Sequence, residues 1–251
     1  MKANLAQQAE LLRSLHHGSQ PLILPNAWDV ASARAVEAAG FPVVATSSYA
    51  VADSLGLEDD DSMPTAMAFG AIGRVSTAVS VPVTADIEAG YQLSPAELVA
   101  ALLGAGAVGC NLEDGDHHGS GVLVPMERQV ERLRAIRQAS DVAGVPIVIN
   151  ARVDAFIREA GEPDARLDEA IRRGKAYLSA GADCVYPIAL RDEDSIRSFV
   201  REVGGPVNIW LRPDGPPRET LAELGVKRIS LATGLYRRSL AEIERALREL
   251  V

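Results

Sequence analysis

The sequence is poor in cysteine and in lysine, and each scarcity narrows what this 251-residue protein can be. The only cysteines, Cys110 and Cys184, lie in apolar, strand-like runs, so we expect a reduced, cytoplasmic protein. The lysines are Lys2, Lys175 and Lys227, at the amino terminus, in a helix-like segment and at the start of an apolar run. None lies inside a strand near its carboxyl end, where a Schiff-base aldolase carries its lysine, which argues against that class.

The sequence also lacks a net positive charge and long apolar runs. The net charge of -9 argues against a nucleic-acid partner or an anionic membrane, because both reward clustered Lys and Arg. No run approaches the roughly 18 uninterrupted apolar residues of a membrane helix. The opening residues, 1–18, lack the apolar core of a signal peptide. A small anionic substrate stays compatible with the sequence, since it responds to local charge.

What the sequence does have is one pattern repeated eight times: a small turn with Gly or Pro, a short apolar run, and then a helix-like segment. Short, nearly continuous apolar runs are typical of parallel strands buried on both faces. The expected strands lie within residues 21–29, 38–48, 79–88, 105–114, 143–152, 180–189, 203–212 and 224–234.

Amphipathic segments alternate with these strands, at 29–39, 94–105, 125–139, 165–180 and 192–203. The stretch SPAE at 94–97 is a typical helix start, with Ser as N-cap and Pro at the first helical position. The pattern predicts an α/β protein, a (β/α)8 TIM-type barrel forming one domain over 1–251. We expect an extra helix at 2–17 and a last helix from about Ser239 to Val251. The alternative, an open doubly wound sheet, lacks a Gly-x-Gly-x-x-Gly motif after its first strand.

Polar residues collect at the carboxyl ends of the expected strands, where barrel enzymes carry their active sites. They stand inside the apolar runs and not after them, which favours an active site over an ordinary polar rim. These residues are Asn26, Asp29, Thr46, Ser47, Ser48, Asp86, Glu88, Asn111, Glu113, Asp114, Asn150, Arg152, Asp154 and Arg212.

The alternation of side chains along a strand indicates how the acids among them are aimed. Asp86 and Glu88, in VTADIEAGY (83–91), would share one side, and Glu113 would point into the barrel while Cys110 points away as a packed thiol. Asp86, Glu88 and Glu113 would then repel one another, and burial would raise their pKa values. A divalent cation removes the conflict. All-oxygen ligands without a His or Cys spacing favour Mg²⁺, or Mn²⁺, over zinc.

Several stretches in this order resemble the isocitrate lyase and phosphoenolpyruvate mutase superfamily over almost the whole chain. They are LPNAWDVASARAVEAAGFPVVATSSYAVADSLGLEDDD (24–61), ADIEAGY (85–91), GCNLEDG (109–115), NARVDAFI (150–157), VNIWLRPDGPP (207–217) and VKRISLATGLY (226–236).

The resemblance implies a homodimer or homotetramer whose last helix is exchanged between subunits. It implies that Asp86 holds Mg²⁺, helped directly or through water by Glu88, Glu113 and Asp59. It also implies that Ser47 and neighbouring backbone N–H groups receive a substrate carboxylate, and that Arg152 contacts the substrate near its reacting centre. The further positions expected to contact substrate are Ser48, Asn26, Trp28, Asn111 and Asn150.

The chain departs from the superfamily in the loop after the fourth strand. That segment, GDHHGSGVLVP (115–125), has neither the cysteine and lysines of the lyases nor the lysine and asparagine of the mutases. Strand three ends in GYQ where Gly-Tyr-Gly is usual, and VYPIAL after strand six lacks the mutase histidine. His117 is one candidate for the catalytic acid or base, although a solvated pair with His118 is the favoured interpretation. Tyr91 is the other, with packing at the strand end as its alternative.

These observations predict a Mg²⁺-dependent carbon–carbon lyase. It would cleave or decarboxylate a small 2-oxo or 2-hydroxy (di)carboxylic acid through a metal-stabilised enolate. One alternative is P–C chemistry on phosphonopyruvate or phosphoenolpyruvate. The other is a non-catalytic protein that binds Mg²⁺ and a 2-oxo acid.

Overall fold

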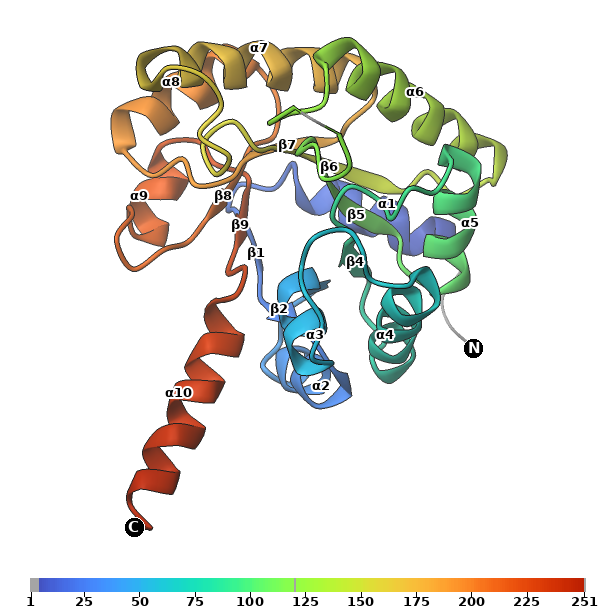
Figure 1. The fold of residues 1–251 in the computed structure, drawn as a ribbon, viewed down its shortest axis with the longest axis vertical. Coiled ribbons are helices and arrows are strands. Elements are labelled where there is room, and N and C mark those ends of the chain that lie inside the picture. The colour runs from blue at the N-terminus through green and yellow to red at the C-terminus, as the bar shows by residue number, and fades with distance from the viewer. Residues whose placement is uncertain (1–4, 120, 251) are drawn as a thin grey trace.

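The computed structural model describes residues 5–119 and 121–250, and its strands form a closed parallel barrel (Figure 1). One sheet has the order β2-β3-β4-β5-β6-β7 and the other β1-β9-β8. Pro25, which has no N–H for the ladder, separates β1 from β2 within one stave, and a bridge from Val185 to Val207 joins β7 to β8. The strands are β1 (Leu22–Leu24), β2 (Asn26–Ala27), β3 (Val44–Thr46), β4 (Val83–Asp86), β5 (Gly109–Glu113), β6 (Val148–Val153), β7 (Cys184–Pro187), β8 (Asn208–Trp210) and β9 (Arg228–Ser230).

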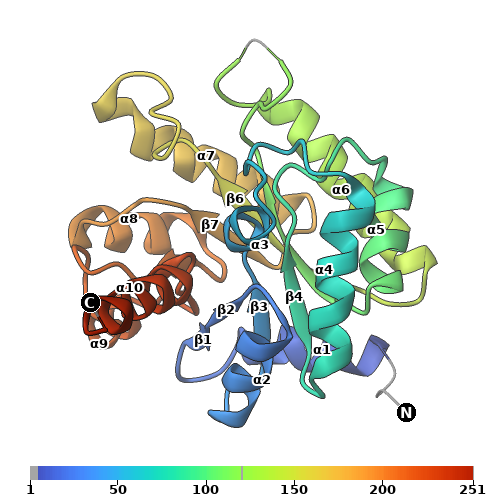
Figure 2. The same ribbon diagram turned by 60° about the horizontal axis from the view of Figure 1, so that its bottom comes forward.

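Helices follow the strands and cover the outside of the barrel (Figure 2). The predicted TIM-type barrel is therefore confirmed, and each expected strand range overlaps an observed strand, with β6 running one residue past its expected end. Ser94 caps α5 with a reciprocal bond to Glu97, as its sequence indicated. The helices are α1 (Leu5–Leu15), α2 (Val30–Ala38), α3 (Ser48–Ser54), α4 (Thr65–Ala78), α5 (Pro95–Gly104), α6 (Met126–Val142), η1 (Pro163–Ala165), α7 (Arg166–Ser179), α8 (Glu193–Val203), α9 (Arg218–Glu223) and α10 (Gly234–Arg248).

The extra helix α1 closes the amino-terminal end of the barrel. Its Ala9 and Leu12 are fully buried against the lower ends of the strands. A Cβ atom added to Gly109 would lie 2.7 Å from Leu12 Cδ2 and 3.1 Å from Val148 O, so glycine at this position lets the Leu12 side chain pack closely on the strand. With the amino end plugged, the carboxyl ends are the open face of the barrel.

The last helix, α10, projects away from the barrel (Figures 1 and 2). It begins at Gly234, earlier than the sequence predicted. Its root is fixed by Tyr236, whose hydroxyl donates to Asp53 Oδ2 at 2.6 Å and whose ring meets Trp28 edge-on at 5.0 Å. Beyond that root, the apolar side chains of Ile243 and Leu247 are exposed. Within the described part of the chain, no helix combines the length and apolarity that crossing a membrane requires.

Candidate metal and substrate site

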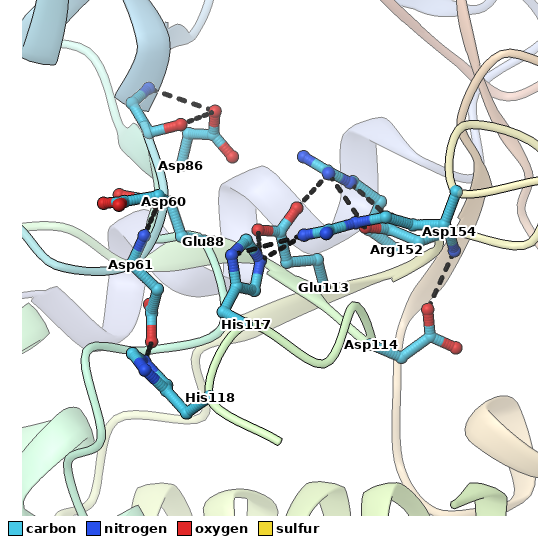
Figure 3. Close-up of polar contacts among 12 residues, drawn as sticks. Asp60, Asp61, Asp86, Glu88, Glu113, Asp114, His117, His118, Arg152 and Asp154 are labelled. Atoms are coloured by element: carbon cyan, nitrogen blue, oxygen red, sulfur yellow. Dashed lines mark hydrogen bonds and ion pairs between the residues drawn. The ribbon is translucent and has the colours of Figure 1, made fainter. Parts of the chain in front are cut away.

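Acidic side chains from neighbouring staves converge at the carboxyl end of the barrel (Figure 3). Asp86 ends β4, Glu113 ends β5, and Arg152 lies opposite Glu113 in the β5–β6 register. The loop after β5 returns over them and contributes His117. This is the face on which the sequence predicted the site.

The carboxylate of Asp86 accepts from three donors, which lie on two elements, α3 and β5. Its Oδ2 accepts from the backbone N–H and the hydroxyl of Ser48, at 3.1 and 2.9 Å, and its Oδ1 accepts from Asn111 Nδ2 at 3.4 Å. Ser47, expected to receive a substrate carboxylate, uses its Oγ to cap α3 by accepting from Ala50 N–H at 3.3 Å. Ser48 therefore orients the acid, and Ser47 fixes the start of the helix that presents Ser48.

Glu88 reaches the site by a different route from the one predicted. Strand alternation was expected to place it beside Asp86, but β4 ends at Asp86 and Glu88 has a left-handed backbone, φ 49°. The prediction that Glu88 continues the strand was wrong. Side chains alternate between the two faces of a sheet only within a strand, and Glu88 lies beyond the end of β4. Glu88 is nevertheless only 2% exposed. Its Oε2 accepts from Asp61 N–H, and its Oε1 has no hydrogen-bond partner among the described residues.

Glu113 joins the metal-ligand candidates to the basic side of the site. Ligand atoms of Glu88, Glu113 and His117 all lie within 4.8 Å of one another. Glu113 Oε1 is 2.7 Å from His117 Nε2, and its Oε2 forms an ion pair with Arg152. Arg152 also donates twice to Asp154, at 2.7 and 3.0 Å. The arginine is thereby held rigidly beside the acids.

The two loop histidines are not the solvated pair favoured from sequence. The His117 side chain is 7% exposed, and it also contacts Arg158 Nη2, at 2.9 Å from Nε2. His118 is more open, but its Nε2 lies 2.8 Å from Asp61 Oδ2. The loop is thus fastened over the acids by both rings. The expectation of an all-oxygen donor set needs the same correction, since one imidazole nitrogen lies within the cluster.

Burial and neighbouring carboxylates raise the pKa values of the acids in the site. Burial, together with the charge of Asp59, raises the pKa of Glu88 to about 8. The pKa of Asp59 rises to about 6, because surrounding protein partly desolvates its carboxyl group and Asp86 lies near it. Burial also raises the pKa of Glu113 against the opposing effect of Arg152. Buried oxygen donors with raised pKa values and an unpartnered Glu88 oxygen fit a divalent cation of the Mg²⁺ or Mn²⁺ type.

The remaining predicted substrate contacts divide into interior and exterior groups. Asn111 and Asn150 are joined inside the barrel, where Asn150 Nδ2 donates to Asn111 Oδ1 at 2.8 Å. Asn26 is also buried, and its Nδ2 donates to Thr46 O at 2.8 Å. Trp28, by contrast, packs on Tyr236 at the root of α10, which explains its place better than a substrate contact does.

Tyr91 is packed as well as polar. It is 7% exposed, with its ring edge-on to Phe69 at 6.0 Å. Burial raises the pKa of its hydroxyl well above the ordinary value, and the Glu88 and Asp86 carboxylates add to the shift. A phenol in that position is a weak proton donor, which favours His117 of the two candidates.

Asp61 and Arg228 are among the residues of the site region that were missed from sequence. Asp61 is 2% exposed and accepts from Tyr91 N–H at 2.8 Å, which joins the EDDD run at 58–61 to the loop after β4. Arg228 is fully buried inside the barrel and donates to Asn111 Oδ1 at 2.9 Å. Asp61 belongs to a run of acidic residues, and nothing in the sequence distinguishes it from its neighbours. Arg228 lies in an apolar strand, and no local pattern indicates that its side chain points into the barrel.

The raised pKa of Glu88 predicts how Mg²⁺ stabilisation depends on pH. Between the unfolded value of 4.5 and the folded value of about 8, the metal-free folded protein holds a proton that the unfolded chain has lost, so its stability falls as pH rises. A cation binds the deprotonated form and removes this loss. The rise in melting temperature on adding MgCl₂ in place of EDTA is expected to be larger near pH 9 than near pH 6. A shift that is equal at both pH values, or larger at the lower one, contradicts the assignment.

A closed (β/α)8 barrel with acids and an arginine at the carboxyl ends of its strands is the architecture of a barrel enzyme. The sequence model of the family described as phosphoenolpyruvate phosphomutase matches residues 12–251. The chain belongs to this family, and so to the isocitrate lyase and phosphoenolpyruvate mutase superfamily, as its motifs predicted.

Individual relatives agree with this assignment. An uncharacterised protein of Mycobacterium tuberculosis H37Rv is 32% identical over 223 residues, which cover 88% of this chain and 81% of the relative. The 2-methylisocitrate lyase of Bacillus subtilis 168 is 29% identical over 203 residues, which cover 78% of this chain and 64% of that enzyme. A crystal structure from Burkholderia cenocepacia J2315, provisionally named a phosphonomutase, matches with a TM-score of 0.91 and 38% identity, covering 96% of this chain and 99% of the other. The expectation of an enzyme of the lyase or mutase kind is thereby supported.

Proposed function

We propose that the protein is a Mg²⁺-dependent enzyme that cleaves or decarboxylates a small 2-oxo or 2-hydroxy (di)carboxylic acid. The observation that carries this proposal is the cluster of Glu88, Glu113 and His117 beside a rigidly held Arg152, with Asp86 at the end of the neighbouring strand β4, at the open face of the barrel. Carboxylates next to a fixed guanidinium suit a substrate that is itself an anion bound through a cation.

Each group at the site has a distinct part in this chemistry. Asp86, Glu88 and Glu113, with Asp59 at the rim, would hold the cation. When bound, Mg²⁺ would supply Lewis-acid polarisation of a carbonyl oxygen of the oxo acid and would offset negative charge that develops there. Arg152 supplies a positive charge, and its two hydrogen bonds to Asp154 hold the guanidinium in one position.

His117 is the candidate for proton transfer. Its Nε2 lies beside Glu113 Oε1 at 2.7 Å, and that hydrogen bond raises the pKa of the imidazole. The ring belongs to the 115–125 loop, which contains neither lysine nor cysteine. Cys110 is no rival, because it is fully buried and burial raises the pKa of its thiol to about 12.

The test is a substrate panel with Mg²⁺: oxaloacetate, 2-methylisocitrate, 4-hydroxy-2-oxo acids, 2-oxoglutarate and phosphonopyruvate. Thermal shift reports binding, and release of pyruvate, carbon dioxide or phosphate reports turnover. Turnover of an oxo or hydroxy acid that is lost in His117→Ala and kept in Cys110→Ala supports the proposal. Turnover of phosphonopyruvate alone identifies P–C chemistry instead, and binding without turnover of any compound identifies a binding protein.

We also propose that the protein is a homo-oligomer, a dimer or tetramer, in which α10 packs on a partner subunit. Ile243 and Leu247, 54% and 57% exposed, form an apolar face four residues apart on a helix that projects from its own barrel. An unpaired apolar face on a projecting helix is satisfied by a second copy of the same chain.

Replacing Ile243 and Leu247 together with serine is therefore expected to lower the mass in solution, ultimately to that of a monomer. Light scattering after size-exclusion chromatography measures it. The matched control is Glu244→Gln, an exposed change on the same helix that leaves the apolar face intact. A wild-type protein that is already monomeric, or a double variant with the wild-type mass, refutes the helix exchange.

A further inference from the structure

The hydroxyl of Tyr186 is a buried polar group that has no hydrogen-bond partner among the described residues. Tyr186 lies on β7 and is 3% exposed. A buried tyrosine hydroxyl usually finds a partner, because an unpaired one costs the free energy of its lost hydration. Tyr177 shows the ordinary arrangement in the same protein: its hydroxyl donates to Asp114 Oδ2 at 2.6 Å and accepts from Arg173 Nη1 at 2.9 Å. The exception at Tyr186 therefore calls for a partner that binds from outside.

Tyr186 is placed on the wall of the candidate site. The β6–β7 register pairs it with Arg152, and directly paired residues on neighbouring parallel strands point to the same side of the sheet. Its phenol is close enough to Arg152 and Asp86 to feel both charges. Burial raises the pKa of the hydroxyl, so at neutral pH it keeps its proton and can donate. Neither the metal set nor the proton-transfer role proposed above uses this group.

We propose that Tyr186 is a substrate-contacting residue whose hydroxyl donates a hydrogen bond to an anionic oxygen of the bound oxo acid. The assignment rests on the proposed function, since it takes its ligand class from there. The protonated Tyr186 phenol and the Arg152 guanidinium are two hydrogen-bond donors on adjacent strands. Two such donors favour an acceptor oxygen with negative charge, either of a carboxylate or of a ketone that gains charge during the reaction. Without substrate the donor stays unpaired, and substrate binding completes it.

The competing explanation is an ordered water molecule that satisfies the hydroxyl permanently. The two explanations differ in the stability of the ligand-free protein. Removing an unpaired buried hydroxyl leaves the free energy of unfolding unchanged or raises it, whereas removing a satisfied one lowers it. Tyr186→Phe, which keeps the ring, and Tyr177→Phe, the matched control with a satisfied hydroxyl, separate them.

The experiment measures urea unfolding of the ligand-free proteins, and the affinities of oxaloacetate and 2-oxoglutarate with MgCl₂ by calorimetry. Tyr186→Phe is expected to unfold at the wild-type urea concentration or above, and to raise the dissociation constant of the better ligand about 10- to 100-fold. Tyr177→Phe is expected to unfold earlier and to leave that constant within about threefold of wild type.

Two results overturn the assignment while the proposed function stands. One is Tyr186→Phe unfolding as early as Tyr177→Phe, or failing to fold, which means that the hydroxyl has a permanent structural partner. The other is an unchanged dissociation constant in Tyr186→Phe. If wild-type protein binds neither these two oxo acids nor any other oxo or hydroxy acid of the panel above, the proposed function itself fails, and the assignment fails with it for that separate reason. If it binds only another compound of the panel, the dissociation constant of that compound is the one compared.

Discussion

Asp86→Asn is expected to abolish stabilisation by Mg²⁺ and to lower turnover by about 10³-fold. Asparagine preserves the volume of the side chain and one acceptor oxygen for Ser48, but it removes the charge on the strand-end acid. Changes to outer-shell groups of metal sites cost about 10- to 100-fold in affinity, so loss of a direct ligand is expected to cost about 100-fold or more. Mg²⁺-dependent thermal shift measures the affinity without requiring a known substrate.

Asp60→Asn is the matched control for Asp86→Asn. Asp60 is exposed and lies near the cluster (Figure 3). Its Oδ1 accepts from Ser62 N–H at 3.1 Å. The same change in net charge is expected to leave Mg²⁺ affinity and turnover within about twofold, because an exposed charge is screened by solvent. Equal losses in both variants would mean that the cation responds only to overall charge. Full turnover in Asp86→Asn would remove Asp86 from the metal site.

Arg152→Gln is expected to reduce both turnover and stability. The guanidinium pairs with Glu113 and donates twice to Asp154, and both acids are buried. Removing one partner of a buried pair costs about 3–5 kcal/mol, because the remaining charge is left without compensation. Losing fixed positive charge near the reacting centre is expected to lower turnover about 10²- to 10³-fold. Urea unfolding and single-substrate kinetics measure the two effects separately.

Arg137→Gln separates catalysis from stability in that comparison. Arg137 also pairs with a carboxylate, Asp183 at 2.6 Å, but it lies at the amino end of the barrel, where it donates to Ile147 O. This variant is expected to lose stability and to keep the turnover of the folded enzyme. If Arg137→Gln loses as much turnover as Arg152→Gln, or Arg152→Gln keeps wild-type turnover, the catalytic role of Arg152 is wrong.

The fold could be predicted because the burial of each element shows as a local pattern in the sequence. Buried parallel strands are short apolar runs, and amphipathic helices have apolar residues three and four apart. Each apolar run became a strand, and Cys110 is the buried thiol that strand alternation predicted. The helix start at Ser94 was legible for the same kind of reason, since capping depends on residues three apart. The order of the elements then determined which face would carry the site.

The positions of individual side chains in the site could not be predicted from the sequence, because they depend on contacts between segments that are far apart in the chain. Glu88 reaches the cluster through a left-handed backbone that strand alternation does not describe. His117 is buried by Glu113 and by Arg158, which lies 41 residues further along the chain. The unpaired hydroxyl of Tyr186 appears only when the whole barrel interior is assembled. A local pattern predicts an element, but only the closed barrel shows which polar atoms remain without partners.

The occupant of the acidic cluster is the point on which the functional account depends most. Anomalous diffraction from crystals grown with Mn²⁺ measures it directly, because manganese identifies itself by its own scattering. The account predicts one strong anomalous peak at the carboxyl end of the barrel. The ion is expected to be coordinated by carboxylate oxygens of Asp86, Glu88 and Glu113, or by water molecules that these oxygens bind. A saturated crystal with no peak there, its acids paired only with Arg152, His117 and solvent, would contradict it.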